Sequence, residues 1–241
     1  MTESLRDISV IVPFHGSDLK WKDLLQDLRP LPKRSEIILV GPDEPSCDIL
    51  SRASRDMLPA VRYVYSPLGR GVQMNSGAKN AENNIFWFLH ADSKVPRSSL
   101  YSLGCALQTD SNAIYYFDLQ FLNDGPKLTA LNSVGANLRA HYLGLPFGDQ
   151  GFVVSRTLFY RIGGFDENSF YGEDQLFVWR ARGKRVPLKR IPYPLFTSAR
   201  RYQAEGWTRA TSKRIFMTYK QAAAEALKLM KARAIERTRK I

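Results

Sequence analysis

The sequence has few cysteines and no long apolar run. Its 241 residues include two cysteines, Cys47 and Cys105, which lie far apart in the chain. Two separated thiols provide neither a disulfide framework nor a metal cluster, so a reducing compartment is the simpler expectation. No apolar stretch approaches the roughly 20 residues that a membrane-spanning helix needs. The apolar stretch at residues 8–13 is too short for a signal peptide. We therefore expect a soluble, cytoplasmic protein.

Acidic residues are scarce relative to basic ones. The chain has 35 Lys and Arg against 23 Asp and Glu, a formal net charge of +12. Residues 198–241 hold 12 of these cations and only 3 of the acids, so most of the excess lies in a basic tail. Such a tail could bind anionic lipid, nucleic acid or another acidic surface, or could form the solvated face of a helix. Peripheral membrane contact is the partner that we keep open, and nucleic acid is the less favoured one.

Repeats and low-complexity linkers are also absent, and the length is sufficient for one sizeable α/β core. The pattern predicts strands at 8–13, 36–40, 61–65, 85–89, 113–122, 151–154 and 186–188. It predicts helices at 18–28, 46–57, 71–81, 98–107, 128–142 and 173–180, and again from residue 205. Strands that alternate with helices favour a mostly parallel sheet flanked by helices. We expect one domain over residues 1–203 and an amphipathic helical tail, 204–241, packed on it or extending from it.

The fourth predicted strand ends close to an acid, in the sequence IFWFLHADS at residues 85–93. In a parallel α/β sheet, ligands bind beyond the carboxyl ends of the strands. Asp92 could hold a divalent cation there, and the cation could hold a diphosphate. Alternatively, Asp92 caps the helix that follows Pro96.

Two polar turns later in the chain carry further acids. Glu173 and Asp174 follow a glycine and open a helix, where acids are stabilised by the helix dipole. A carboxylate in that position could also act as a general base toward an incoming hydroxyl. The turn at residues 148–151 is either an ordinary tight turn or a loop whose Asp149 and Gln150 bind a ligand.

Two basic segments could reach a phosphate. Residues 69–78 lack the Gly-Lys-Ser/Thr ending of a Walker loop, but Arg70 and nearby backbone N–H groups could bind a phosphate or a base. Arg200 and Arg201 follow the last predicted strand, and guanidinium groups pair well with diphosphate oxygens. They could equally be the first residues of the basic tail.

Taken in chain order, these segments resemble the family 2 glycosyltransferases, which have the Rossmann-like GT-A fold. Within that family they look similar to the bacterial branch linked to arsenosugar biosynthesis and selenodomain proteins. The matching segments are residues 9–13, 69–78, 88–92, 144–151, 163–165, 172–174 and 197–201. The resemblance implies inverting, metal-dependent transfer of a hexosyl group from a nucleotide-diphosphate sugar, a UDP-sugar first, to a hydroxyl acceptor.

The resemblance also implies roles for individual residues. Asp174 is similar to the catalytic base of the family, with Glu173 beside it, and Asp92 to the acid that holds Mg²⁺ or Mn²⁺. The residues implied in nucleotide-sugar binding are Pro13, Phe14, Asp43, Arg70, Asn75, Asp149, Gln150, Arg200 and Arg201.

Two positions depart from the family pattern. His90 stands where many relatives have the first acid of Asp-x-Asp, and Gly41 stands where they have an acid that binds the base or ribose. Asp43 or Glu44 could substitute for the latter. Two alternatives therefore stay open: a nucleotidyltransferase that releases pyrophosphate, and a non-catalytic GT-A-like domain that binds nucleic acid or membrane through its tail.

Overall fold

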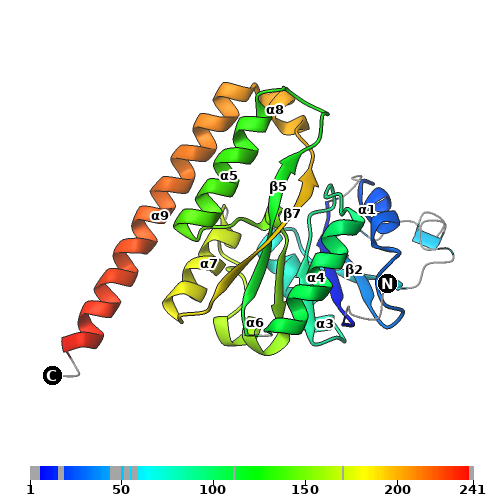
Figure 1. The fold of residues 1–241 in the computed structure, drawn as a ribbon, viewed down its shortest axis with the longest axis horizontal. Helices are drawn as coiled ribbons and strands as arrows, with labels where there is room; N and C mark the ends of the chain where they lie inside the picture. Colours follow the sequence, from blue (N-terminus) through cyan, green and yellow to red (C-terminus); the bar gives the residue numbers. More distant parts are fainter. Residues whose placement is uncertain are drawn as a thin grey trace.

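A seven-stranded sheet forms the centre of the described molecule (Figure 1). The computed structural model describes residues 6–15, 19–43, 50–51, 55, 59–110, 112–169 and 171–238, with side chains up to 231. The strand order is β3-β2-β1-β4-β6-β5-β7. The strands are β1 (Ser9–Pro13), β2 (Glu36–Gly41), β3 (Ala60–Tyr65), β4 (Ile85–Phe88), β5 (Ile114–Phe121), β6 (Phe152–Ser155) and β7 (Leu188–Thr197).

The sheet is mostly parallel, which confirms the predicted fold class. β1 pairs in parallel with both β2 and β4, and β2 pairs in parallel with β3. β6 runs antiparallel to its neighbours β4 and β5, whereas β7 runs parallel to β5. The carboxyl ends of β1, β2, β3 and β4 therefore lie along one edge, where a ligand site is expected.

Helices cover both faces of this sheet. They are α1 (Trp21–Leu28), α3 (Arg70–Asn80), α4 (Arg97–Thr109), α5 (Thr129–Leu143), the 3₁₀ turn η1 (Gly148–Gln150), α6 (Arg156–Ile162), α7 (Glu173–Gly183), α8 (Arg200–Glu205) and α9 (Trp207–Thr238). Most of the helix predicted at 46–57 lies outside the described residues, as do Glu44 and Cys47.

Alternating side chains of the central strands build two apolar cores. Val10 of β1 packs in one cluster with Leu24 of α1 and Leu103 of α4. Its neighbour Ile11 packs in the other cluster with Met74 of α3. Strands that are buried on both faces have nearly continuous apolar sequences, which is why β1 and β4 could be recognised from their composition.

In the C-terminal half, strand β7 and helix α6 differ from the elements that the local pattern predicted. The strand expected at 186–188 is wrong in extent, because β7 runs over Leu188–Thr197 and includes Pro192 and Pro194. β7 is an edge strand, and its register against β5 shifts at Pro192 and Tyr193, so the prolines cost the sheet little. Helix α6 was also missed, although Ser155 caps it by accepting the Leu158 N–H at 3.3 Å.

The basic tail is mostly one long helix that begins against the domain. The boundary expected at 203/204 falls inside α8. Asn132 of α5 donates to Thr211 of α9 at 3.0 Å and accepts from the Trp207 indole at 2.7 Å. Figure 1 shows α9 beside α5, with its C-terminal end pointing away from the sheet. Among the described helices, none combines the length and the hydropathy that crossing a bilayer requires.

Candidate functional site

One arginine joins three segments at the carboxyl edge of the sheet. Arg70 is the first residue of α3, and its Nη2 contacts Nε2 of His90, just beyond β4. Its Nε lies 3.2 Å from Oε1 of Glu173, the first residue of α7. Two helix starts and one strand end, distant in sequence, therefore meet at a single guanidinium.

The Asp174 carboxylate is held in one orientation beside this guanidinium. Its Oδ2 accepts the backbone N–H of Gly148 at 2.7 Å, and its Oδ1 accepts the N–H of Gln175 at 2.7 Å. The side chain is 9% exposed, so it is almost buried but open on one side. A carboxylate held in one orientation at the N-terminus of a helix can act as a general base toward a hydroxyl within hydrogen-bond reach.

Two glycines make this close approach possible. A Cβ on Gly148 would lie 2.8 Å from Arg70 Nη2 and 3.1 Å from Asp174 Oδ2, so a larger residue would displace the Arg70 guanidinium or the Asp174 carboxylate. Gly172 adopts φ 72°, a left-handed conformation that favours glycine, and a Cβ there would overlap the Gln221 amide. These two glycines therefore allow separate segments of the chain to come close together, and they also form the turns next to the acids.

A third carboxylate, Asp149, is held in a poorly solvated position. Its Oδ1 is buried without a hydrogen-bond partner among the described residues. Burial raises the pKa of Asp149 to about 6, with Arg139 acting in the opposite direction and Asp174 adding to the rise. Burial also raises the pKa of Glu173, against the effect of Arg70. These carboxylates and guanidinium groups affect one another's pKa values. Binding of a proton or a charged ligand to one of them therefore changes the pKa values of the others.

His90 is neutral in this environment. Burial, and then the charges of Arg70 and Arg201, hold the pKa of His90 well below its usual value. A neutral ring can accept a hydrogen bond from Arg70 through Nε2. Arg201 is therefore close to His90, whereas Arg200 donates to Ser198 Oγ at 3.1 Å and lies 3.6 Å from Asp124.

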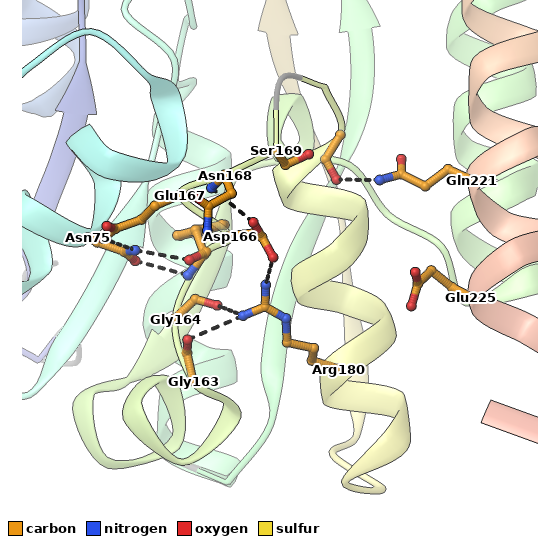
Figure 2. Close-up of polar contacts among 12 residues, drawn as sticks. Asn75, Gly163, Gly164, Asp166, Glu167, Asn168, Ser169, Arg180, Gln221 and Glu225 are labelled. Carbon is orange, nitrogen blue, oxygen red and sulfur yellow. Dashed lines mark hydrogen bonds and ion pairs between the residues drawn. The ribbon is translucent and has the colours of Figure 1, made fainter. Parts of the chain in front are cut away.

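Two predicted binding residues hold loops of the site. Gln150 is fully buried, with Nε2 donating to Phe117 O at 3.0 Å and Oε1 accepting the Phe147 N–H at 3.1 Å. Asn75 bonds both the N–H and the carbonyl of Phe165, at 2.9 and 3.0 Å, and reaches Glu167 at 2.8 Å (Figure 2). Gln150 therefore fixes the turn that carries Asp149, and Asn75 fixes the loop before α7.

The same loop is tied to α7 from the other side. Arg180 forms a 2.7 Å ion pair with Asp166 and donates to the carbonyls of Gly163 and Gly164 at 3.3 and 3.2 Å (Figure 2). Residues 163–167 are thus held between α3 and α7.

An aromatic ring fills the space beside Gly41. Phe14 is 4% exposed, and its ring centroid lies 6.4 Å from that of Trp21 and 6.3 Å from that of Tyr63. A Cβ on Gly41 would come within 2.9 Å of the Phe14 ring, which explains why an acid is absent there. Pro13 is buried in β1, and Asp43 is exposed in the loop after β2.

Asp92 is the acid nearest to the end of β4, and it is partly buried. Among the residues that the structure describes, no three His, Cys, Asp or Glu side chains converge as a protein-built metal cage. Mg²⁺ usually keeps several waters and binds one or two carboxylates together with substrate phosphates. The single carboxylate of Asp92 is a donor that fits this mode of binding.

Two arginines of the site were not identified from the sequence. Arg139 of α5 lies 3.5 Å over the Phe147 ring centroid and affects the pKa of Asp149. Within residues 129–143 it is the lone Lys or Arg, and a lone cation in an otherwise uncharged helix was an available signal. Arg214 of α9 also affects Asp149, but nothing in sequence separates it from the other cations of the tail.

No protein-family model and no curated protein matches this chain. Solved structures do match. S. aureus TarS in complex with UDP-GlcNAc superposes with a TM-score of 0.60 at 20% identity, over 80% of this chain and 58% of that one. The mannosyltransferase PcManGT from Pyrobaculum calidifontis, in complex with GDP-Man and Mn²⁺, gives 0.59 at 15% identity, over 81% and 58%. GalNAc-T7 with UDP, GalNAc and Mn²⁺ gives 0.62 at 14%, over 81% and 44%.

These similarities establish the fold. The central sheet and its helices have the GT-A architecture that the sequence motifs predicted. The chain spans 44–58% of the length of these three neighbours. Because a shared fold can carry different chemistries, function has to be argued from the site itself.

Proposed function

We propose that this protein is a glycosyltransferase that moves a sugar from a nucleotide-diphosphate sugar to a hydroxyl acceptor. The observation that carries the proposal is the Asp174 carboxylate, fixed by the Gly148 N–H beside the Arg70 guanidinium. It lies at the ligand-binding edge of a fold whose neighbours were solved with UDP-GlcNAc, GDP-Man and UDP. The ordered motifs of residues 8–205 support family 2 and its arsenosugar-linked branch as the finer assignment.

Arg70 and Arg201 are the groups that we assign to the donor diphosphate. Arg70 contacts His90, and the charge of Arg201 lowers the pKa of the same histidine. A guanidinium offers several N–H donors that match phosphate oxygens. Glu173 keeps Arg70 in place through their 3.2 Å contact. We assign Asp92 to Mg²⁺ or Mn²⁺, which when bound to the diphosphate would make the nucleoside diphosphate a better leaving group.

Asp174 is the proposed base. It takes the proton of the acceptor hydroxyl while that oxygen forms a bond to the anomeric carbon. The bond from this carbon to the diphosphate oxygen breaks at the same time, and its electron pair leaves with the nucleoside diphosphate. Attack opposite the leaving group inverts the anomeric configuration, and no covalent enzyme intermediate is needed. Asp149 borders the same space and is the second acid that could contact the sugar or the acceptor.

The donor base is the least constrained part of the proposal. Pro13, Phe14 and Asp43 lie at the ends of β1 and β2, where the resemblance puts the base, and Gly41 brings no acid to it. Asn75 and Gln150 act on this site by holding its loops. A hexosyl donor linked to UDP is the first candidate to test.

A thermal-shift panel tests donor binding. UDP-, GDP-, ADP- and dTDP-sugars are each measured with Mn²⁺, Mg²⁺ or EDTA. A ligand at about 100 times its Kd stabilises the folded state by about 2.7 kcal/mol. We expect one nucleotide sugar to raise the melting temperature of the wild type in the presence of metal. Asp92→Asn should lose this shift, and Asp118→Asn, at a partly buried ion-pair residue on β5, should keep it.

Product analysis with the donor that binds then tests the chemistry. Release of a nucleoside diphosphate supports sugar transfer, whereas release of pyrophosphate would assign the site to a nucleotidyltransferase. If no nucleotide sugar produces a shift under any metal condition, the proposal is wrong and the fold is used without donor binding.

A further inference from the structure

Helix α5 presents an uncharged apolar face to solvent. Leu131, Val134, Leu138 and Tyr142 are 60%, 55%, 51% and 74% exposed. Their spacing of three and four residues puts them on one side of the helix. Arg139 lies over the Phe147 ring at the site, away from this stripe. An exposed stripe of large apolar side chains on a folded domain indicates a contact surface.

Helix α9 adds a second apolar stripe with a basic flank. Its exposed large apolar residues are Ile215, Phe216, Tyr219, Leu227 and Met230. Arg209, Lys213, Lys220 and Lys231 are exposed on the same helix, and helical periodicity puts them beside this stripe. The remaining side packs on the domain through Ala222, Ala226 and Leu229. The helix therefore has three distinct faces: packed, apolar and basic.

The two stripes belong to neighbouring helices. Asn132 joins α5 to α9 through its hydrogen bonds to Thr211 and Trp207, and the helices lie side by side in Figure 1. We call six of the exposed apolar residues of these helices the α5–α9 face: Leu131, Val134, Leu138, Ile215, Phe216 and Tyr219.

We propose that the α5–α9 face docks on an anionic lipid bilayer. Helices that lie in the membrane interface combine an apolar face of aromatic and aliphatic residues with a face rich in Lys and Arg. The basic flank complements anionic headgroups, which attract cations near the surface. Glu225, an acid on this part of α9, is paired with Lys228 at 2.6 Å and leaves the flank positive.

Two other occupants fit this surface less well. A second copy of the chain would form a self-complementary interface, which would bring the same lysines near each other on a chain of charge +12. Single-stranded nucleic acid is bound through cations and stacking aromatics. Leu131, Leu138 and Ile215 offer no ring for stacking, whereas acyl chains suit them.

The docking helix also supports the acids of the site. Gln221 of α9 donates to the carbonyls of Gly172 and Tyr171 at 3.3 and 3.4 Å. Gln175 of α7 donates to the Thr218 carbonyl at 3.1 Å. Docking would therefore hold the start of α7, with Glu173 and Asp174, across α9 from the bilayer, at a distance of about one helix diameter. This consequence, which rests on the proposed function, points to an acceptor hydroxyl that is carried by a lipid.

Vesicle flotation of the full chain, without nucleotide, tests the docking. The probes are phosphatidylcholine vesicles with and without phosphatidylglycerol, at low and high salt. We expect binding to the phosphatidylglycerol vesicles that weakens with salt, because screening reduces the attraction of the lysines. The paired substitutions Leu131→Asp with Leu138→Asp, and Lys213→Glu with Lys220→Glu, should each reduce binding at least tenfold.

Control variants introduce the same acidic residues elsewhere on the surface. Tyr101→Asp on α4 and Lys33→Glu before β2 change exposed residues outside the α5–α9 face and should leave binding unchanged. If the aspartate pair fails to fold, Leu131→Gln with Leu138→Gln provides a milder test of the same stripe.

Several outcomes would overturn the proposal. These are absence of vesicle binding, equal binding to both vesicle types, and unchanged binding of the α5 and α9 variants. A dimer in the absence of lipid that the Leu131 and Leu138 changes disrupt would assign the face to a second copy. Binding to RNA in place of vesicles would assign it to nucleic acid. Failure of docking and failure of donor binding are distinguishable, because flotation uses no nucleotide and the thermal-shift panel uses no lipid.

Discussion

The backbone N–H of Gly148 donates a 2.7 Å hydrogen bond to Oδ2 of Asp174. This contact joins the turn after α5 to the start of α7, and Arg70 fits against the same glycine. The orientation of the proposed base therefore depends on a peptide 26 residues earlier in the chain. Changes at either end of this contact should affect chemistry more than folding.

Replacing the base should stop transfer and preserve donor binding. Asp174→Asn keeps the size of the side chain but cannot accept a proton, and loss of general-base catalysis costs about 10²- to 10⁴-fold in rate. The measurement is kcat with the donor identified in the thermal-shift panel. Asp118→Asn serves as the matched control. Full activity of Asp174→Asn would remove this residue from the mechanism.

A methyl group at position 148 should disturb the site geometry. In Gly148→Ala the new Cβ would press on Arg70 and Asp174 at 2.8 and 3.1 Å, so we expect a large fall in kcat. Gly135→Ala on α5 is the control, because nothing lies within 4 Å of its Cβ. That control should raise stability by about 0.5–1 kcal/mol, since alanine favours a helix over glycine. Equal activity of the two variants would contradict the close approach.

Stability should fall with rising pH because of Asp149. Its pKa rises from 3.8 to about 6 in the folded protein, so between these values the native state binds more protons than the unfolded state. The resulting penalty grows through this range and is complete above it, on the order of 2–3 kcal/mol. Asp149→Asn removes it, and its melting temperature should exceed that of the wild type more at about pH 7.5 than at about pH 4. A pH-independent difference would contradict the raised pKa.

Donor affinity should depend on the guanidinium shape of Arg70. Arg70→Lys retains the charge but cannot serve His90 and Glu173 together, and a lost charge-assisted hydrogen bond costs about 1.5–3 kcal/mol. We expect KM for the donor to rise about tenfold or more. Arg62→Lys weakens the ion pair with the buried Glu36, 2.7 Å away on β2, and should lower stability with KM unchanged. The reverse pattern would assign Arg70 a purely structural role.

Local sequence determined the first half of the sheet and the ends of its strands. β1, β2 and β4 are short apolar runs bounded by polar residues or by Gly and Pro, and such runs are typical of strands buried on both faces. Because parallel strands end at one edge, the position of His90 beside Arg70 at this edge was also expected from the sequence. The helix start at Glu173 could also be recognised from local sequence, because a glycine is followed there by two acids.

Tertiary structure alone decided what these residues contact. Gln150 and Asn75 look like polar residues available for a ligand, yet their amides are used by the backbone of Phe117 and Phe165. β7 retains its prolines only because it lies at the sheet edge. Arg139 and Arg214 both affect the pKa of Asp149 from helices distant in sequence. The lone cation of α5 was a local signal for Arg139, whereas nothing in its own segment marks Arg214. Periodicity reports how one segment buries its own side chains, whereas hydrogen bonds and charges between distant segments depend on how those segments pack together.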